Sequence, residues 1–153
     1  MMRGVLILLL VNITLLVPSV GYAAPTSCAV STSNFNFGTY NPLNPVSTIV
    51  TGTNLITVTC TKKDTVTVDL STGGSGTYFP RALSYGPNTL NYNFYTTASL
   101  TTIWGNGTGG TGDIVQSVKK NTATSFSVYG QITALQNVAP GSYSDSITVT
   151  VSF

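Results

Sequence analysis

The chain contains no histidine and no glutamate, and charged residues make up only 7% of its 153 residues. General acid–base catalysis would therefore depend on aspartate, tyrosine, cysteine or lysine, and a Ser-His-Asp arrangement is impossible. The spacing of Asp64, Asp69 and Asp113 gives no sign of a shared site, because they fall in a turn, in a strand pattern and after a glycine-rich loop. We predict no catalytic residues, no cofactor site and a protein that is not an enzyme.

Positive charge is scarce as well. The pairs Lys62-Lys63 and Lys119-Lys120 fit solvated turns better than the basic stripe that nucleic acid requires. Threonine, serine, asparagine and glycine are abundant instead, as on the surface of extracellular structural or adhesive proteins. We expect no nucleic acid partner.

The chain has only two cysteines, Cys28 and Cys60. Two thiols without histidine or glutamate cannot complete a zinc site, so we expect no metal. In an oxidising compartment the one possible intramolecular pairing is a Cys28–Cys60 disulfide. Closing a loop of this size is expected to contribute about 3–4 kcal/mol on the chain-entropy account.

The first segment has the pattern of a secretory signal peptide. Arg3 precedes an apolar run over residues 5–17, which Pro18 and Gly21 then break. The run is too short for a transmembrane helix, and no other membrane segment follows. We expect cleavage after Ala23 and release through the periplasm, leaving residues 24–153 as a single domain.

The rest of the chain shows strand patterns and turns, without a helical period. Alternating apolar residues begin at Phe35 and Phe37, and Lys62-Lys63-Asp64 reads as a short hairpin connection. Six to eight strands at roughly 10-residue spacing predict an all-β, antiparallel sandwich of immunoglobulin type. The expected core residues are Phe35, Phe37, Ile56, Val58, Val66, Val68, Leu70, Leu90, Tyr92, Phe94, Phe126, Val128, Ile147, Val149 and Val151.

The last pattern alternates strictly through Ile147, Val149, Val151 and Phe153, the final residue of the sequence. A strand with one apolar face and no following partner is an aggregation hazard unless something covers it.

The glycine-rich residues 105–112 predict a mobile surface loop. Trp104 beside this loop is a candidate for surface contact, although core packing is the favoured alternative.

Several segments together resemble the spore coat protein U domain family, which includes subunits of archaic chaperone–usher pili. The resemblance runs in the family's order over nearly the whole of residues 24–153. It is carried by Cys28-Ala-Val-Ser, Phe37-Gly-Thr-Tyr-Asn-Pro42, Ile56-Thr-Val-Thr-Cys60, Arg81-Ala-Leu83, Leu90-Asn-Tyr-Asn-Phe-Tyr95, Trp104-Gly-Asn-Gly-Thr108, Val128-Tyr-Gly-Gln131 and Gly141-Ser-Tyr-Ser-Asp145.

This resemblance implies an incomplete sandwich that lacks its last strand. A periplasmic chaperone would lend a strand first, and a neighbouring subunit would replace it at an outer-membrane usher, by strand addition. The strand-acceptor edge would be Ile147, Val149, Val151 and Phe153, with the Phe153 carboxylate anchored on the chaperone. The implied product is a secreted, non-catalytic subunit of an adhesive, biofilm-type surface fibre (pilus or fimbria) or of a coat.

The residues before Cys28 depart from the polymerising pattern. A donor strand needs roughly ten residues of alternating apolar type, whereas only residues 24–27 would remain, and Pro25 cannot donate a ladder hydrogen bond. We expect a strand acceptor rather than a donor. The alternative is a self-sufficient secreted module that binds a polysaccharide or other ligand through Trp104, Tyr78 or Tyr85.

Overall fold

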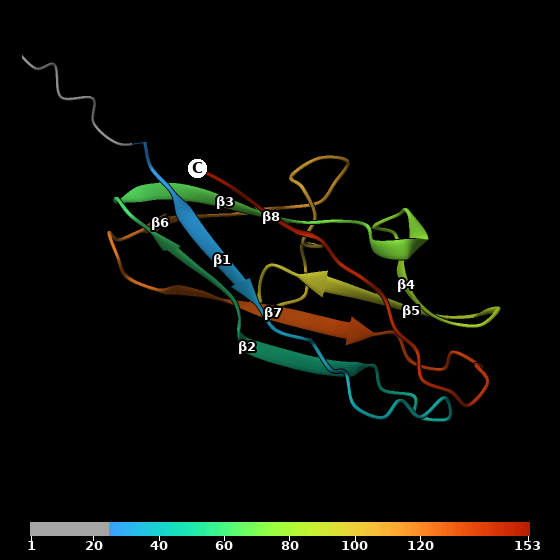
Figure 1. Ribbon diagram of the computed structural model, residues 1–153. Coiled ribbons are helices and arrows are strands. Elements are labelled where there is room, and N and C mark those ends of the chain that lie inside the picture. The colour runs from blue at the N-terminus through green and yellow to red at the C-terminus, as the bar shows by residue number, and fades with distance from the viewer. Residues whose placement is uncertain (1–24) are drawn as a thin grey trace, which may run out of the picture.

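The computed structural model describes residues 25–153, so the predicted signal peptide over residues 1–23 lies outside the described part (Figure 1). That part contains eight strands and one short 3₁₀ turn, η1. Their bounds are β1 Cys28–Thr32, β2 Thr48–Cys60, β3 Asp64–Leu70, η1 Gly73–Ser75, β4 Arg81–Tyr85, β5 Asn88–Tyr95, β6 Ile114–Val118, β7 Thr124–Ile132 and β8 Val149–Ser152. No helix among residues 25–153 is long and apolar enough to cross a membrane.

The strands form two antiparallel sheets. The larger sheet has the order β1-β2-β7-β5-β4, and the smaller has the order β6-β3-β8. Two sheets that bury alternating side chains between them are the architecture expected of an immunoglobulin-like sandwich. The predicted fold class is therefore confirmed.

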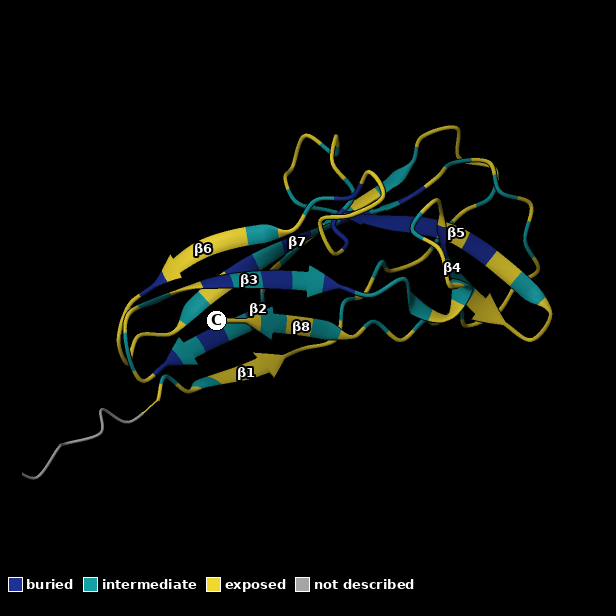
Figure 2. Cartoon of the chain, turned by 90° about the horizontal axis from the view of Figure 1, so that it is seen from above, coloured by how far each residue is buried: buried dark blue, intermediate teal, exposed yellow. Residues whose placement is uncertain are grey.

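The core follows from the alternation along individual strands. In β3 the buried residues are Val66, Val68 and Leu70, and the residues between them, Thr67 and Asp69, are only partly buried. Figure 2 shows burial concentrated on β3, β5 and β7, whereas β1 and most of β6 are exposed. The core also contains Trp104, Val118 and Ile132, which the predicted core does not include.

The connection through Lys62 and Lys63 is not a hairpin. β2 pairs with β1 and β7, while β3 pairs with β6 and β8, so residues 61–63 cross from one sheet to the other. The hairpin prediction is wrong. Alternation shows which side chains face the core, and it does not show whether the next strand joins the same sheet or the opposite one.

One further prediction of strand position needs correction, and two strands of the structure have no counterpart in the sequence prediction. Phe35 and Phe37 lie in an irregular segment, although both pack against the core. The two strands without a prediction are β1 and β6, and both are mostly exposed. Four of the five residues of β1 are exposed, and in β6 only Ile114 and Val118 are not. An edge strand with so few inward side chains carries little alternation.

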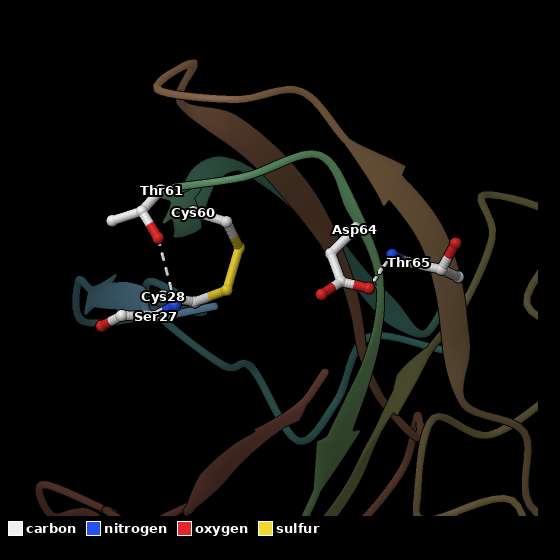
Figure 3. The surroundings of a disulfide bond; sticks show 6 residues. All are labelled: Ser27, Cys28, Cys60, Thr61, Asp64 and Thr65. Atoms are coloured by element: carbon white, nitrogen blue, oxygen red, sulfur yellow. Dashed lines mark hydrogen bonds between the residues drawn. A yellow bond between two sulfur atoms is a disulfide. The ribbon is translucent and has the colours of Figure 1, made fainter. Parts of the chain in front are cut away.

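The disulfide joins the start of β1 to the end of β2, as Figure 3 shows. Cys28 and Cys60 are direct register partners in the antiparallel ladder, and Ser27 donates its N–H to Thr61 Oγ1 at 3.1 Å. The predicted pairing is confirmed. It fixes β1 to the outer edge of the larger sheet.

Candidate functional site

The main cavity is an open groove of about 1110 Å³ between the two sheets. We call residues 32–42 its N-terminal rim and residues 138–149 its C-terminal rim. The floor consists of Leu55, Ile56, Leu70, Leu83, Leu90, Tyr92, Phe94, Val128 and Ile132. The floor is apolar, the rims carry many polar residues, and a trough of this size is larger than most small-molecule pockets. Its two long rims suit an extended polypeptide segment.

The N-terminal rim is anchored by aromatic packing. The Phe35 ring lies 5.0 Å from the Phe94 ring, and the Phe37 ring lies 5.6 Å from the Tyr92 ring, centroid to centroid. Gly130 of β7 makes room for both rings, since a Cβ there would lie 2.7 Å from each. Glycine is needed at this position for close approach rather than for an unusual backbone angle.

The backbone of the N-terminal rim has few ladder partners. Ser33 N–H donates to Leu55 O at 2.8 Å just after β1, and Gly38 N–H donates to the Asn36 side chain at 2.7 Å. From residue 33 to residue 47 the segment belongs to no strand. Beyond Ser33, the rim therefore presents apolar side chains to the core and a backbone that belongs to no strand ladder of the described chain.

The C-terminal rim changes from one sheet to the other. Ser144 and Ser84 of β4 exchange two backbone hydrogen bonds, of 2.8 and 3.1 Å. Four residues later, Ser71 N–H donates to Thr148 O at 3.0 Å, just beyond β3. Figure 1 shows this red segment returning along the molecule to β8. The rim therefore crosses the open side of the sandwich over residues 145–147.

Asp145 occupies the crossing point. Its carboxylate accepts hydrogen bonds from Tyr92 Oη at 2.7 Å, from Gly74 N–H at 2.8 Å and from Ser146 N–H at 2.8 Å. Burial raises the pKa of Tyr92, and the hydrogen bond to Asp145 raises it further. The phenol therefore stays protonated and acts as the donor.

Arg81 lies beneath this region with no exposed surface. Its guanidinium donates to Ser71 O from Nε at 2.9 Å and from Nη2 at 2.8 Å, and to Trp104 O at 2.7 Å. It also lies 4.9 Å over the Tyr78 ring. Burial lowers the pKa of Arg81, and the negative charge of Asp145 is among the influences that raise it. The buried guanidinium of Arg81 thus holds the Ser71 carbonyl, and with it the chain just after β3.

One side chain ties the N-terminal rim to the segment that precedes the C-terminal rim. Tyr40 Oη accepts a hydrogen bond from Gln136 N–H at 2.7 Å. The Gln136 carboxamide is bound in turn to the backbone of Asn91 in β5, at 2.7 and 2.9 Å. This bridge connects the N-terminal rim to the segment that leads into the C-terminal rim.

The structure distributes the four predicted acceptor-edge residues unevenly. Ile147 and Val149 line the groove, and Val151 packs against the core from β8. Phe153 is 55% exposed and follows the end of β8. The outer edge of β8 has no ladder partner among the described strands, because β8 pairs only with β3.

Trp104 is not a surface residue. It is fully buried, and its indole N–H donates to Val68 O at 2.8 Å. The surface-contact prediction for Trp104 is wrong, and its core alternative is confirmed. Tyr78 is half-buried with its hydroxyl bound to Leu70 O, whereas Tyr85 is 46% exposed and packs against Tyr143.

Asp69 and Asp113 lie closer than their sequence spacing suggested. Val68 pairs with Ile114 in the β3–β6 ladder, so Asp113 continues that register opposite Asp69. Burial raises the pKa of Asp69, and the charge of Asp113 raises it further. One carboxylate oxygen of Asp69 is buried without a hydrogen-bond partner. Within residues 25–153 no cluster of three or more His, Cys, Asp or Glu side chains could hold a metal ion.

Sequence reasoning did not assign roles to Asp145, Tyr92 and Arg81 at the groove. Tyr92 was expected only as core, and Arg81 only as part of a weak strand. One feature of the sequence could have drawn attention to Asp145. It is one of only four acidic residues in the chain, and it stands immediately before the final strand pattern. Its partners could not be found from sequence, since they lie 53 and 71 residues away.

Comparison with known proteins gives consistent matches. The family model described as "Spore Coat Protein U domain" matches residues 14–150. Protein U of Myxococcus xanthus is 30% identical over 146 residues, covering 88% of this chain and 80% of that protein.

A similar solved structure is the CsuC-CsuE chaperone-tip adhesion subunit pre-assembly complex from archaic chaperone-usher Csu pili of Acinetobacter baumannii. The match to one chain of that complex has a TM-score of 0.60 and 20% identity. It covers 84% of the present chain but only 40% of that solved chain, so the likeness establishes a shared fold.

Proposed function

The chain belongs to the Spore Coat Protein U domain family, and we propose that it is a non-catalytic structural or adhesive subunit of a secreted surface fibre or coat. The groove carries this proposal. Its apolar floor is open along two rims. One rim follows β1 of the larger sheet, and the other passes from β4 of the larger sheet to β8 of the smaller one. A strand placed between them could form hydrogen bonds with the rim backbones and insert alternate side chains into the floor.

We propose a periplasmic chaperone as the first supplier of that strand and a neighbouring subunit as the second, with exchange at an outer-membrane usher. The solved complex with a similar fold contains a chaperone and a tip subunit, which supports this choice of partner. By the family resemblance, Phe153 would belong to the strand-acceptor edge that the chaperone contacts. The cell surface, as a pilus or a coat, is the proposed destination.

The proposed role is strand acceptor. Ile147 and Val149 line the groove, which supports acceptance. The donor role is disfavoured on the expectation that cleavage follows Ala23, since residues 24–27 would then be the only free segment before the disulfide at Cys28.

The test is periplasmic expression with and without a co-expressed periplasmic chaperone of the archaic chaperone–usher type. Alone, the chain is expected to aggregate or be degraded. With the chaperone it should purify as a stable one-to-one complex. A soluble, stable monomer obtained without any chaperone would contradict the proposal.

A matched pair of variants locates the interface. Val149→Ser changes a groove residue, whereas Val115→Ser makes the same change at a 61% exposed position on the opposite edge strand of the same sheet. The first is expected to reduce the yield of complex and the second to leave it unchanged. Equal yields from both variants would place the chaperone elsewhere.

A further inference from the structure

The C-terminal rim lacks sheet pairing where it crosses between the sheets. Ser144 is bound to β4 of the larger sheet, and Thr148 is bound at the end of β3 of the smaller one. Between these two points, no backbone hydrogen bond joins residues 145–147 to another segment within residues 25–153. A segment that spans the open side of a sandwich in this way would be free to fold inward over the apolar floor.

The side chain of Asp145 supplies the missing connections. One carboxylate oxygen is bound to Tyr92, which is 2% exposed and belongs to the central region of the larger sheet. The other oxygen is bound to Gly74 in η1, the short turn that follows β3 and contacts β4 of the larger sheet. One carboxylate thus fixes the crossing segment both to β5 and to the turn that follows β3.

The site is shaped to admit this carboxylate. A Cβ at Gly73 would collide with Asp145 Oδ2, and Gly73 has a φ of +70°, which also favours glycine. Ser71 adds a second attachment, because its Oγ accepts from Thr148 N–H at 2.9 Å while its carbonyl is held by Arg81. Both attachments lead to side chains that are completely or almost completely buried.

We propose that Asp145 is a positioning residue that, through Tyr92, holds the C-terminal rim extended while the groove is empty. This inference rests on the strand-acceptor function proposed above. Once a strand has entered, its backbone would hold the rim by hydrogen bonds of its own. The Asp145 contacts should therefore control the rate of strand capture more than the rate of strand loss.

The test compares the full-length secreted chain with its Tyr92→Phe variant, which keeps the ring and removes the hydroxyl. Each is released from its chaperone complex into labelled ten-residue peptides that carry valine, leucine, isoleucine or phenylalanine at alternate positions between threonines. We expect capture by Tyr92→Phe to be about tenfold slower, the effect of one hydrogen bond to a charged group. The rate of peptide loss should stay within about twofold of the wild type.

The matched control is Tyr95→Phe. Tyr95 lies on the same strand and donates its hydroxyl to Gln131 at 3.1 Å, but it does not line the groove. This variant should capture peptide at the wild-type rate. If Tyr92→Phe does not fold, Asp145→Asn keeps the size of the side chain and removes its charge, and it should slow capture in the same direction.

Amide hydrogen exchange provides a readout that needs no added strand. Tyr92→Phe should speed exchange at Gly74, Ser146 and Thr148 relative to Tyr95→Phe. Unchanged exchange together with wild-type capture in both Tyr92→Phe and Asp145→Asn would overturn the positioning role and leave the acceptor function standing. If the wild-type chain captures no peptide and forms no chaperone complex, the acceptor function itself is wrong.

Discussion

The N-terminal rim of the groove is held by covalent and apolar contacts, whereas the C-terminal rim is held by hydrogen bonds to buried polar groups. Phe35 and Phe37 rest on Gly130, and the disulfide fixes β1 just upstream. Asp145 and Ser71 perform the corresponding task on the other side. Apolar contacts are strong but undirected, while hydrogen bonds are weaker and fix orientation. We expect the contacts of the N-terminal rim to contribute more to the free energy of unfolding. We expect those of the C-terminal rim to contribute more to the shape of the groove.

Removal of the disulfide should have the largest effect on stability. Cys28 and Cys60 are separated by 32 residues, and the chain-entropy account predicts a loss of about 3–4 kcal/mol for the Cys28→Ser, Cys60→Ser double variant. Urea unfolding of the purified chaperone complex, with and without reductant, measures this loss. A change below about 1 kcal/mol would mean that aromatic packing alone secures this rim.

Phe37→Ala should come next, with a loss of about 2 kcal/mol, because the removed ring is only partly buried. Leu43→Ala is the control in the same segment. Leu43 is 85% exposed, so its replacement should leave the free energy of unfolding almost unchanged. Limited proteolysis should show faster cleavage of residues 33–47 in Phe37→Ala alone. Similar losses in both variants would contradict the view that the rings anchor this rim.

Ser71→Ala tests the C-terminal rim. It removes the Oγ acceptor for Thr148 N–H while keeping the Ser71 backbone carbonyl that binds Arg81. A loss of about 1 kcal/mol is expected from chemical denaturation, with faster amide exchange at Thr148. Protection at Thr148 equal to that of the wild type would show that another contact sets the path of this rim.

The smallest effect concerns Asp69, in the strand that pairs with β8. Its pKa is raised above the ordinary 3.8 by burial and then by Asp113, so the folded chain binds more protons than the unfolded chain just above pH 3.8. The free energy of unfolding should therefore fall as the pH rises through this window.

Asp69→Asn should remove this pH dependence and be slightly more stable than the wild type at neutral pH, with the gain disappearing below about pH 3.8. Denaturation curves at several pH values measure the difference. Asp113→Asn should reproduce part of it, because Asp113 is the second cause of the shift. A stability gain in Asp69→Asn that does not change with pH would exclude a titration effect.

The sequence predicted the fold where alternation is strong. Val66, Val68 and Leu70 alternate with polar residues and form β3, and the cysteines allow one pairing. Alternation was misleading at Phe35 and Phe37, because it reports which side chains face inward and not whether the backbone has a partner. The Lys62-Lys63 connection failed for a similar reason, since a polar turn does not reveal which sheet the next strand joins.

The candidate site was predictable only in outline. Ile147 and Val149 follow from their pattern, but a fully buried arginine reads in sequence as a surface residue. Arg81 becomes understandable only when Ser71 O, Trp104 O and the Tyr78 ring are seen around it. Contacts between residues this far apart depend on the folded path of the chain and leave no local signal.

The position of the groove between the two sheets has a mechanical consequence. A strand seated between them would join two separate hydrogen-bond networks into one. Force applied along that strand would load all its backbone hydrogen bonds at once in shear, instead of opening them one after another from an end. A fibre joined at such grooves would resist pulling along its axis far better than its modest individual bonds suggest.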